Sequence, residues 1–507
     1  MRDITRNEFL AWAGKAALGA VAGGALSTLV GRSAAADPGA PVTVLSGATV
    51  IDGTGAPPMP DTGIVLAGDR ILAVGRLPEI PLPPGVRTVQ LAGKHVIPGL
   101  WDMHTHIADA ERTFQPLYVV HGVTGIREMW GFPHTGDLRR RLDEGQLLGP
   151  RMVFAGSIID GPPGVWPGSE VVATEAEARA AVRRTRDIGA DFVKVYSLLS
   201  RETLTAIADE SRRVGLPFAG HVPHRVPVAE AVDLGQRTIE HMYGMQLATS
   251  SRAPELYAEI AATWDDPKAD MSRRDVMERE AGETYSPERA AALFDQMIRR
   301  GVWQSPTITV EQRYLTGPPT KGPDAQDMMR YLPRFIHEFW GGLEAASPPL
   351  SAAKRDIAQR NFDARMQLLG AMNAAGVGIV AGTDAGNPYV FPGATLHEEL
   401  GWLVQAGLSP MQALQSATSN AARCAGLADV SGTIGVGKYA DLVVLDRDPL
   451  ADIGNTRRIH AVVSRGRYLS EQDRARIFGE IETAAGEESG QVLPSGGALP
   501  RCCPRGR

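Results

Sequence analysis

The sequence predicts an α/β protein: a (β/α)₈ TIM barrel accompanied by a small β-sandwich domain that both flanks of the chain build together. Two observations carry this prediction. Short apolar runs alternate with amphipathic segments through residues 98–425, and turn-rich β segments occur on both sides of that region, at 41–97 and 430–470. The chain has 507 residues, which is enough for more than one hydrophobic core.

The flanking segments are expected to be antiparallel because short apolar runs follow one another with turn dipeptides between them. The first flank contains Val42–Leu45, Gly63–Leu66 and Arg70–Val74, and the second contains Ala440–Leu445 and His460–Ser464. Turns in the first flank are marked by Asp52-Gly53, Gly68-Asp69 and Gly93-Lys94. Since both flanks consist of short apolar runs separated by turns, we expect them to share one composite domain.

The middle of the chain supplies the eight strands of the expected barrel. They are predicted at residues 100–107, 122–129, 151–159, 191–197, 217–222, 238–242, 303–308 and 378–384. Amphipathic helices lie between most of them, most clearly at 175–189 and 201–215, and helices near 394–404 and 409–425 close the barrel. Eight strands that alternate with helices favour a barrel over an open sheet.

Insertions interrupt this alternation after the sixth and seventh strands. Residues 243–301 are rich in Arg, Glu and Ala and are expected to form extra helices beside the mouth of the barrel, whereas 317–327 has loop character. After the barrel and the second flank, residues 471–507 are expected to form a helix followed by a flexible tail.

Residues 1–36 have the composition of an export signal. Arg2 and Arg6 precede a weakly apolar stretch rich in Ala and Gly, which ends in a small-residue cleavage site at Ala36. The segment resembles a twin-arginine signal, although Asn7 stands where the second arginine belongs. We therefore expect a secreted or cell-envelope protein; the alternative is a cytoplasmic protein with a disordered or amphipathic N-terminal arm.

Composition excludes several classes of function. The formal net charge is −6 and the sequence has no basic stripe, so nucleic acid is not expected as a partner. No segment after the N-terminal one has the apolar length that a membrane span needs. Cys424 is expected in the core and Cys502 and Cys503 in the tail, so no disulfide framework is implied. The expected partner is a small-molecule or short-peptide substrate, and a homo-oligomer is left open.

His104 and His106 end an apolar run and are the most informative residues of the chain. On a β-strand, alternate residues share a face, so both imidazoles point the same way. Two neutral imidazoles that converge on one point supply about two-thirds of a typical catalytic zinc site. The alternative is that two histidines flank a threonine at a strand end without binding an ion.

Four more polar residues fall at the expected strands, at whose ends a barrel places its catalytic groups. Lys194 interrupts the apolar fourth strand, which is unusual because an unpaired buried ammonium is costly. His221 ends the fifth strand, His241 the sixth and Asp384 the eighth. Each has a structural alternative: a lysine with a surface-directed tip, hydrogen-bonded structural histidines, and an aspartate that caps a helix.

In this order the residues resemble the amidohydrolase superfamily, which has His-x-His on strand one and then Lys, His, His and Asp on strands four, five, six and eight. The resemblance spans residues 41–470. The short sequence motifs around these residues are most similar to those of the branch of imidazolonepropionase-like enzymes and metal-dependent Xaa-Pro dipeptidases, which act on amide, lactam and peptide bonds. The segments that support this similarity are Gly220-His221-Val222-Pro223, Ile239-Glu240-His241, Gly301-Val302-Trp303, Pro306-Thr307 and Gly382-Thr383-Asp384-Ala385-Gly386.

The resemblance implies a dinuclear metal centre. One ion would be bound by His104, His106 and Asp384, the other by His221 and His241, and N6-carboxylated Lys194 would bridge them. Two divalent ions would hold a bridging hydroxide, with zinc favoured and manganese, iron or cobalt as alternatives. Asp384 would take the proton of the attacking water and pass it to the leaving group. Asp102 would orient a ligand or hold a loop.

Substrate contacts are expected close to these ligands. Tyr196 shares the face of Lys194 and could donate to a carbonyl or oxyanion, which makes it a catalytic and substrate-binding candidate. The other predicted substrate-binding residues are His224 and Arg225, which could meet a carboxylate, and Tyr243 and Trp303, which could line the pocket. Three aromatic residues on other expected loops hint at an apolar or aromatic substrate: Trp130, Trp166 and Tyr389.

The sequence thus predicts a metal-dependent hydrolase that cleaves an amide-type C–N bond in a peptide, an N-acyl amino acid or a lactam. Two alternatives stay open. The same fold could act on an ester, lactone or phosphotriester, or serve as a cyclising or dehydrating tailoring enzyme. A barrel without catalysis could be a binding protein, although the complete ligand set argues against it.

Overall fold

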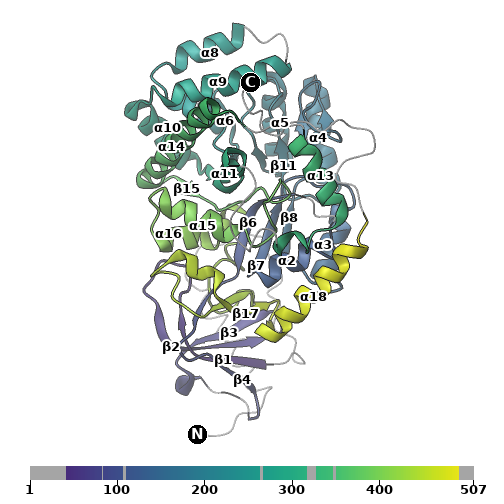
Figure 1. Cartoon of the computed structure of the whole chain (residues 1–507), viewed down its shortest axis with the longest axis vertical. Coiled ribbons are helices and arrows are strands. Elements are labelled where there is room, and N and C mark those ends of the chain that lie inside the picture. The colour runs from purple at the N-terminus through teal and green to yellow at the C-terminus, as the bar shows by residue number, and fades with distance from the viewer. Residues whose placement is uncertain are drawn as a thin grey trace.

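The structure is a computed structural model that describes residues 42–80, 82, 84–106, 110–262, 267–316, 327–345 and 350–489, with the backbone alone for 267–272. The predicted export segment lies outside these residues, as do 317–326 of the second insertion and the tail from residue 490. Figure 1 shows the strands of the first flank at one end of the molecule and the helical insertion at the other, with the parallel strands between them.

Strands from both flanks form one sheet of eight strands, in the order β18-β17-β16-β5-β1-β2-β3 with β4 beside β1. They are β1 (Val42–Val50), β2 (Met59–Ala67), β3 (Arg70–Gly75), β4 (Arg87–Gln90), β5 (His95–Pro98), β16 (Leu442–Leu445), β17 (Ile459–Ser464) and β18 (Arg467–Leu469). The antiparallel pair β5–β16 joins the two flanks, with Val96 opposite Val444, and side chains from both share one hydrophobic cluster. A sandwich of two facing layers stays a prediction.

The middle of the chain forms parallel sheets, so the predicted α/β class is confirmed. The smaller sheet contains β6 (Leu100–Thr105), β7 (Val123–Glu128) and β8 (Arg151–Phe154). The larger sheet has the order β10 (Glu170–Val171), β9 (Ile159–Asp160), β11 (Val193–Val195), β12 (Phe218–Gly220), β13 (Thr238–Glu240), β14 (Trp303–Ser305) and β15 (Gly378–Ile379). Parallel bridges join Ala155 to Phe192 and Thr105 to Ala385. Both edges of the smaller sheet therefore lie beside the larger sheet or its continuation.

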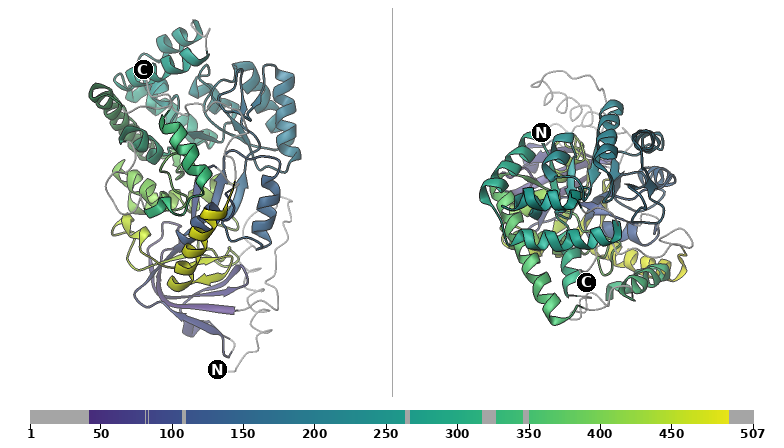
Figure 2. Two further views of the ribbon diagram at one scale, coloured as in Figure 1. Left: turned by 45° about the vertical axis from the view of Figure 1, so that its right-hand side comes forward. Right: turned by 90° about the horizontal axis from the view of Figure 1, so that it is seen from above.

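Helices follow most of the parallel strands and lie outside them (Figure 2). They are α2 (Phe114–Val120), α3 (Thr135–Asp143), α4 (Glu175–Asp187), α5 (Arg201–Val214), α6 (Val228–Leu234), α7 (Met245–Thr249), α8 (Ala253–Ala262), α9 (Pro267–Gly282), α10 (Pro287–Arg300), α11 (Ile308–Thr316), α13 (Arg334–Ala345), α14 (Ala352–Ala375), α15 (Leu396–Gln405), α16 (Pro410–Ser416), α17 (Ser419–Cys424) and α18 (Glu471–Glu487). The starts of α4 and α5 match the prediction because Thr174 and Ser200 cap them. Within the described ranges, no helix has the length and apolarity to cross a membrane.

The C-terminal helix α18 fastens the sheet of the flanks to the parallel strands. It runs along the side of the molecule across their junction (Figure 2). Arg474 donates from Nε to the Val120 carbonyl at 2.9 Å and from Nη1 to the Ile459 carbonyl at 2.7 Å. Beyond the end of the helix, Glu488 accepts from the Thr113 hydroxyl at 2.6 Å. One helix therefore holds α2 and β17 together.

Trp101 fixes the position of β6, the strand that carries the histidine pair. Its buried indole lies over Gly125 of β7, where a Cβ atom on residue 125 would come within 2.2 Å of the ring. Its Nε1 donates to the Ser431 hydroxyl at 3.1 Å, which connects β6 to the segment that leads into the second flank. A glycine at 125 is thus required by the close approach of the ring.

Gly125→Ala is expected to destabilise the protein by about 1–3 kcal/mol, because the new methyl group overlaps the Trp101 ring inside a packed core. Gly401→Ala is the matched control, since nothing lies within 4 Å of a Cβ added to Gly401 in α15 and alanine favours a helix. Thermal unfolding followed by circular dichroism should give a lower midpoint for the first variant only. Equal midpoints would contradict the tight contact between β6 and β7.

Candidate metal centre

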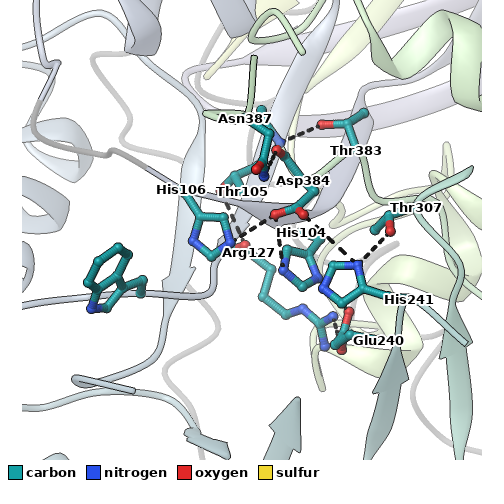
Figure 3. A network of polar contacts seen from close by, with 12 residues as sticks. His104, Thr105, His106, Arg127, Glu240, His241, Thr307, Thr383, Asp384 and Asn387 are labelled. Atoms are coloured by element: carbon teal, nitrogen blue, oxygen red, sulfur yellow. Dashed lines mark hydrogen bonds and ion pairs between the residues drawn. The ribbon is translucent and has the colours of Figure 1, made fainter. Parts of the chain in front are cut away.

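All six predicted ligands meet at the carboxyl ends of the parallel strands. They come from β6 and the residue after it, β11, the turns after β12 and β13, and the segment after β15: His104, His106, Lys194, His221, His241 and Asp384. His106 is partly exposed and the other five are buried. Figure 3 shows His104, His106 and His241 arranged around the Asp384 carboxylate. Residues separated by up to 280 positions in the sequence, from 104 to 384, therefore share one site.

Asp384 is the centre of the cluster. Its Oδ1 lies 2.9 Å from Nε2 of His106 and 3.5 Å from Nε2 of His104. Its Oδ2 lies 3.9 Å from Nδ1 of His241. One ring nitrogen each of His104 and His106 and one carboxylate oxygen of Asp384 all lie within 4.8 Å of one another, a spacing that one metal ion could bridge.

His221 and His241 form the other side of the cluster. Their ring centroids are 4.9 Å apart, and those of His241 and His104 are 4.6 Å apart. Nδ1 of His221 is hydrogen-bonded to the Ser197 hydroxyl at 2.8 Å, and Nδ1 of His241 to the Thr307 hydroxyl at 2.7 Å. Hydrogen bonds at Nδ1 leave Nε2 of each ring for a further ligand.

Burial sets the protonation of these groups. It lowers the pKa of His241 to about 4. Together with the nearby Lys194, burial also lowers the pKa of His104 and of His221 well below the ordinary value. These rings are therefore neutral near pH 7, which is the form that binds metals. Burial alone would raise the pKa of Asp384, but the neighbouring His104 holds it below its ordinary value, so the carboxylate is ionised.

Glu240 orients His104 from the side away from Asp384. It accepts from Nδ1 of His104 at 2.7 Å, from Nη2 of Arg127 at 2.8 Å and from the Thr238 hydroxyl. Arg127 also donates to the Met103 carbonyl at 2.6 Å. Burial would raise the pKa of Glu240, but Arg127 and His104 hold it well below the usual range. The result is a buried carboxylate that is fully paired and fixes the ring of a ligand.

Asp102 holds the loop that carries Asp384. Its carboxylate accepts from the Thr383 backbone N–H at 3.0 Å, from the Thr383 hydroxyl at 2.6 Å and from the His104 backbone N–H at 3.2 Å. Burial raises the pKa of Asp102 to about 7. Asp384 has φ of 63° and His241 has φ of 57°, a left-handed conformation that non-glycine residues adopt at a cost. Such strain persists where surrounding bonds determine the backbone, and it is concentrated at functional sites.

The residues present fit a divalent cation. Nε2 of His104 and Nδ1 of His106 are buried without a hydrogen-bond partner among the described residues, although leaving a buried polar nitrogen unsatisfied is costly. A metal ion at Nε2 of His104 would remove that cost. Neutral imidazoles together with an ionised carboxylate form a donor set that suits zinc and other first-row divalent metals.

A cavity of about 450 Å³ opens onto the six candidate ligands. The rest of its lining is formed by Trp130, Ile158, Trp166, Tyr196, Phe339, Gly386 and Asn387. Tyr196 stacks on His221 with ring centroids 3.9 Å apart. An apolar and aromatic lining with a few convergent polar groups is typical of a small-molecule site.

The other predicted substrate residues do not line this cavity. His224 is buried, and burial together with Arg274 lowers its pKa to about 3, so it has no charge with which to attract a carboxylate. Arg225 is exposed. Tyr243 lies outside the cavity lining, with its ring centroid 4.6 Å from that of His221. Trp303 begins β14, at the end remote from the ligands, and packs with the Trp101 cluster.

Two residues close to the site were missed by the sequence analysis although a signal was present. Arg127 and Glu240 are charged residues inside short apolar strands, the same anomaly that identified Lys194. Ser197 and Thr307 carried no comparable signal because hydroxyl residues are common at strand ends. Phe339 comes from α13, which the sequence did not predict, and Tyr389 packs against Trp340 rather than lining the cavity.

Comparison with known proteins gives a match over most of the chain. The sequence profile of the amidohydrolase family matches residues 95–469. Solved structures with the same fold include a Xaa-Pro dipeptidase with bound methionine in the active site (21% identity, TM-score 0.59, covering 85% of this chain and 100% of that one). Bottromycin amidohydrolase (22%, 0.65, 88% and 91%) and A. niger ochratoxinase (18%, 0.60, 92% and 99%) are also similar. No curated protein sequence matches the chain.

Glu240→Gln is expected to weaken zinc binding about 10–100-fold, because the neutral amide orients His104 less firmly and leaves Arg127 without its counter-charge. Titration of the metal-free protein with zinc against a competing chelator measures this affinity. Glu288→Gln, at an exposed position in the first turn of α10, serves as the control and should bind zinc as the parent does. Unchanged affinity in a folded Glu240→Gln protein would refute the orienting role.

Proposed function

Because the chain belongs to the amidohydrolase family, we propose that it is a metal-dependent hydrolase that cleaves an amide-type C–N bond in a small molecule or short peptide. The observation that carries this proposal is the convergence of four imidazole rings, a lysine and an ionised aspartate on one cavity. An alternative role as a binding protein without catalysis would not require this arrangement.

The proposed fold around this centre is a closed (β/α)₈ TIM barrel beside a β-sandwich. Support comes from the parallel bridges that join both edges of the smaller sheet to the larger one or its continuation. Backbone bonds from Met103 to Ala381 and from Asp384 to His104, at 2.9 and 2.8 Å, connect the first strand with the last. In a barrel of this kind, catalytic groups lie at the carboxyl ends of the strands.

The proposed cofactor is a pair of divalent ions, with zinc as the best match to nitrogen and oxygen donors. His104, His106 and Asp384 would hold one ion, His221 and His241 the other, and Lys194 would bridge them as an N6-carboxylated side chain. When bound, such ions supply an activated water at neutral pH and polarise the scissile carbonyl. Carboxylation would convert a buried cation into an anion among imidazoles whose pKa the lysine otherwise lowers.

Asp384 is the proposed proton carrier. Its carboxylate is ionised and contacts His106 at 2.9 Å, so it can accept the proton of the attacking water and deliver it to the leaving nitrogen. Tyr196, stacked on His221 at the cavity wall, is the proposed contact for the substrate carbonyl. We also propose export to the cell envelope or medium, on the signal-like composition of residues 1–36.

Asp384→Asn should reduce kcat at least about 100-fold, because an amide cannot accept and relay the proton. Turnover of N-acyl amino acids, Xaa-Pro dipeptides, lactams, esters and phosphotriesters by the zinc-loaded protein is the measurement. Asp295→Asn, an exposed change in α10, is the control. If Asp384→Asn retained full activity, the proposed role would be wrong, and turnover of esters alone would overturn the amide assignment.

Lys194→Ala should lose the bridging anion and with it most of the activity, while added acetate or propionate should restore part of it by supplying a carboxylate in the vacated space. A second readout does not depend on turnover: ¹³C NMR in labelled bicarbonate should show a carbamate signal in the parent and in Lys354→Ala, but not in Lys194→Ala. Lys354 is exposed at the start of α14 and is the matched control. A carbamate signal that persists in Lys194→Ala would contradict the assignment.

A further inference from the structure

An aromatic wall faces the candidate ligands across the cavity. We define it by Trp130, Ile158, Trp166 and Tyr196, which pack as one buried cluster, with Phe339 partly buried against them. The indole rings of Trp130 and Trp166 are 5.5 Å apart at 50°. Trp130 also meets His106 edge to face, with ring centroids 6.4 Å apart. The wall therefore begins directly beside the proposed metal ligands.

The wall is preorganised by one buried carboxylate. Asp160 accepts from the backbone N–H groups of Gly161 at 2.9 Å, Val165 at 2.9 Å and Leu198 at 2.7 Å. These bonds tie the loop that carries Trp166 to the segment that follows Tyr196. Nε1 of Trp166 then donates to the Tyr196 hydroxyl at 2.8 Å. The aromatic faces are thus held in place before any ligand arrives, which reduces the ordering cost of binding.

One polar atom of the wall has no hydrogen-bond partner among the described residues. Nε1 of Trp130 is buried and makes no hydrogen bond within the described part of the chain. Buried indole N–H groups usually find an acceptor. Trp130 lines the cavity, so a bound molecule is the natural source of that acceptor.

From these observations we propose that the wall binds an aromatic group of the substrate, next to the bond that is cleaved, with a hydrogen-bond acceptor on that group facing Nε1 of Trp130. Rigid aromatic faces bind planar rings by offset or edge-to-face contacts. The substrate class is therefore an amide with an aromatic substituent rather than a small aliphatic dipeptide. This inference rests on the proposed function, because it places the ring beside the proposed catalytic centre.

Binding of two hydroxamates to the zinc-loaded protein tests the wall separately from catalysis. 2-Naphthohydroxamate and acetohydroxamate present the same metal-chelating group, so the ratio of their dissociation constants reports the contribution of the ring. Calorimetry should show the naphthyl compound binding at least about tenfold more tightly, because stacking and apolar burial add to chelation. Trp130→Leu and Trp166→Leu should each reduce that ratio at least about threefold. Trp402→Leu, in α15 and outside the cavity lining, should keep the parent ratio.

A ratio near one in the parent, or the same ratio in all variants, would overturn the aromatic subsite, as would failure of both compounds to bind. A different result would contradict the proposed function: a protein that binds both hydroxamates with the expected ratio but does not turn over any amide. The acceptor is tested with quinoline and isoquinoline hydroxamates that together carry the ring nitrogen at each position of the distal ring. At least one isomer should bind more tightly than the naphthyl compound to the parent and lose that gain in Trp130→Phe. If no isomer gains, the hydrogen bond to Nε1 is refuted.

Discussion

The candidate site depends on the mutual pairing of charged groups that are almost completely removed from water. Arg127, Lys194, Glu240 and Asp384 all lie at the carboxyl ends of the parallel strands, where an isolated charge would be very costly. Arg127 and Glu240 neutralise each other at 2.8 Å, and the same glutamate holds His104. Lys194 lies among imidazoles whose pKa it lowers, and a carbamate there would replace a buried cation with an anion.

Three of the imidazoles are fixed through Nδ1 by different partners. Glu240 holds His104, the Ser197 hydroxyl holds His221, and the Thr307 hydroxyl holds His241. The ionised carboxylate of Glu240 requires a proton on Nδ1 of His104, and the hydrogen bond at Nδ1 leaves Nε2 of each ring for a further ligand. The backbone is left-handed at His241, directly after β13, and at Asp384, in the segment after β15, where these two side chains join the cluster. Local strain and hydrogen bonding therefore act together to set one ligand geometry.

The sequence was sufficient to predict the parallel α/β core and the residues that gather at it, because ligand spacing and strand alternation are local signals. His104 and Asp384 could be placed together only through the resemblance to the amidohydrolases, and the structure brings Nε2 of His104 within 3.5 Å of the Asp384 carboxylate. The sequence located the cavity wall only in part: Trp130, Trp166 and Tyr196 were named as candidates and do line the cavity. Trp303 was expected there and lies at the opposite end of β14, since the prediction fixed its strand but not its distance from the carboxyl end. Phe339 was missed because its contact depends on how a helix distant in sequence folds back over the strands.

The groups that would perform the chemistry and those that would select the substrate come from different parts of the fold. The candidate ligands lie on strands or directly after them, and their positions depend on buried pairs such as Arg127 with Glu240. Trp130 and Trp166 lie on loops, whose shape depends on separate bonds: Glu128 accepts from the Trp130 backbone N–H at 3.1 Å, and Asp160 holds the Trp166 loop. Glu128 also accepts from the Thr105 hydroxyl at 3.4 Å and lies 3.9 Å from Nδ1 of His106, so the Trp130 loop and the strand of the ligand histidines are coupled through this one carboxylate.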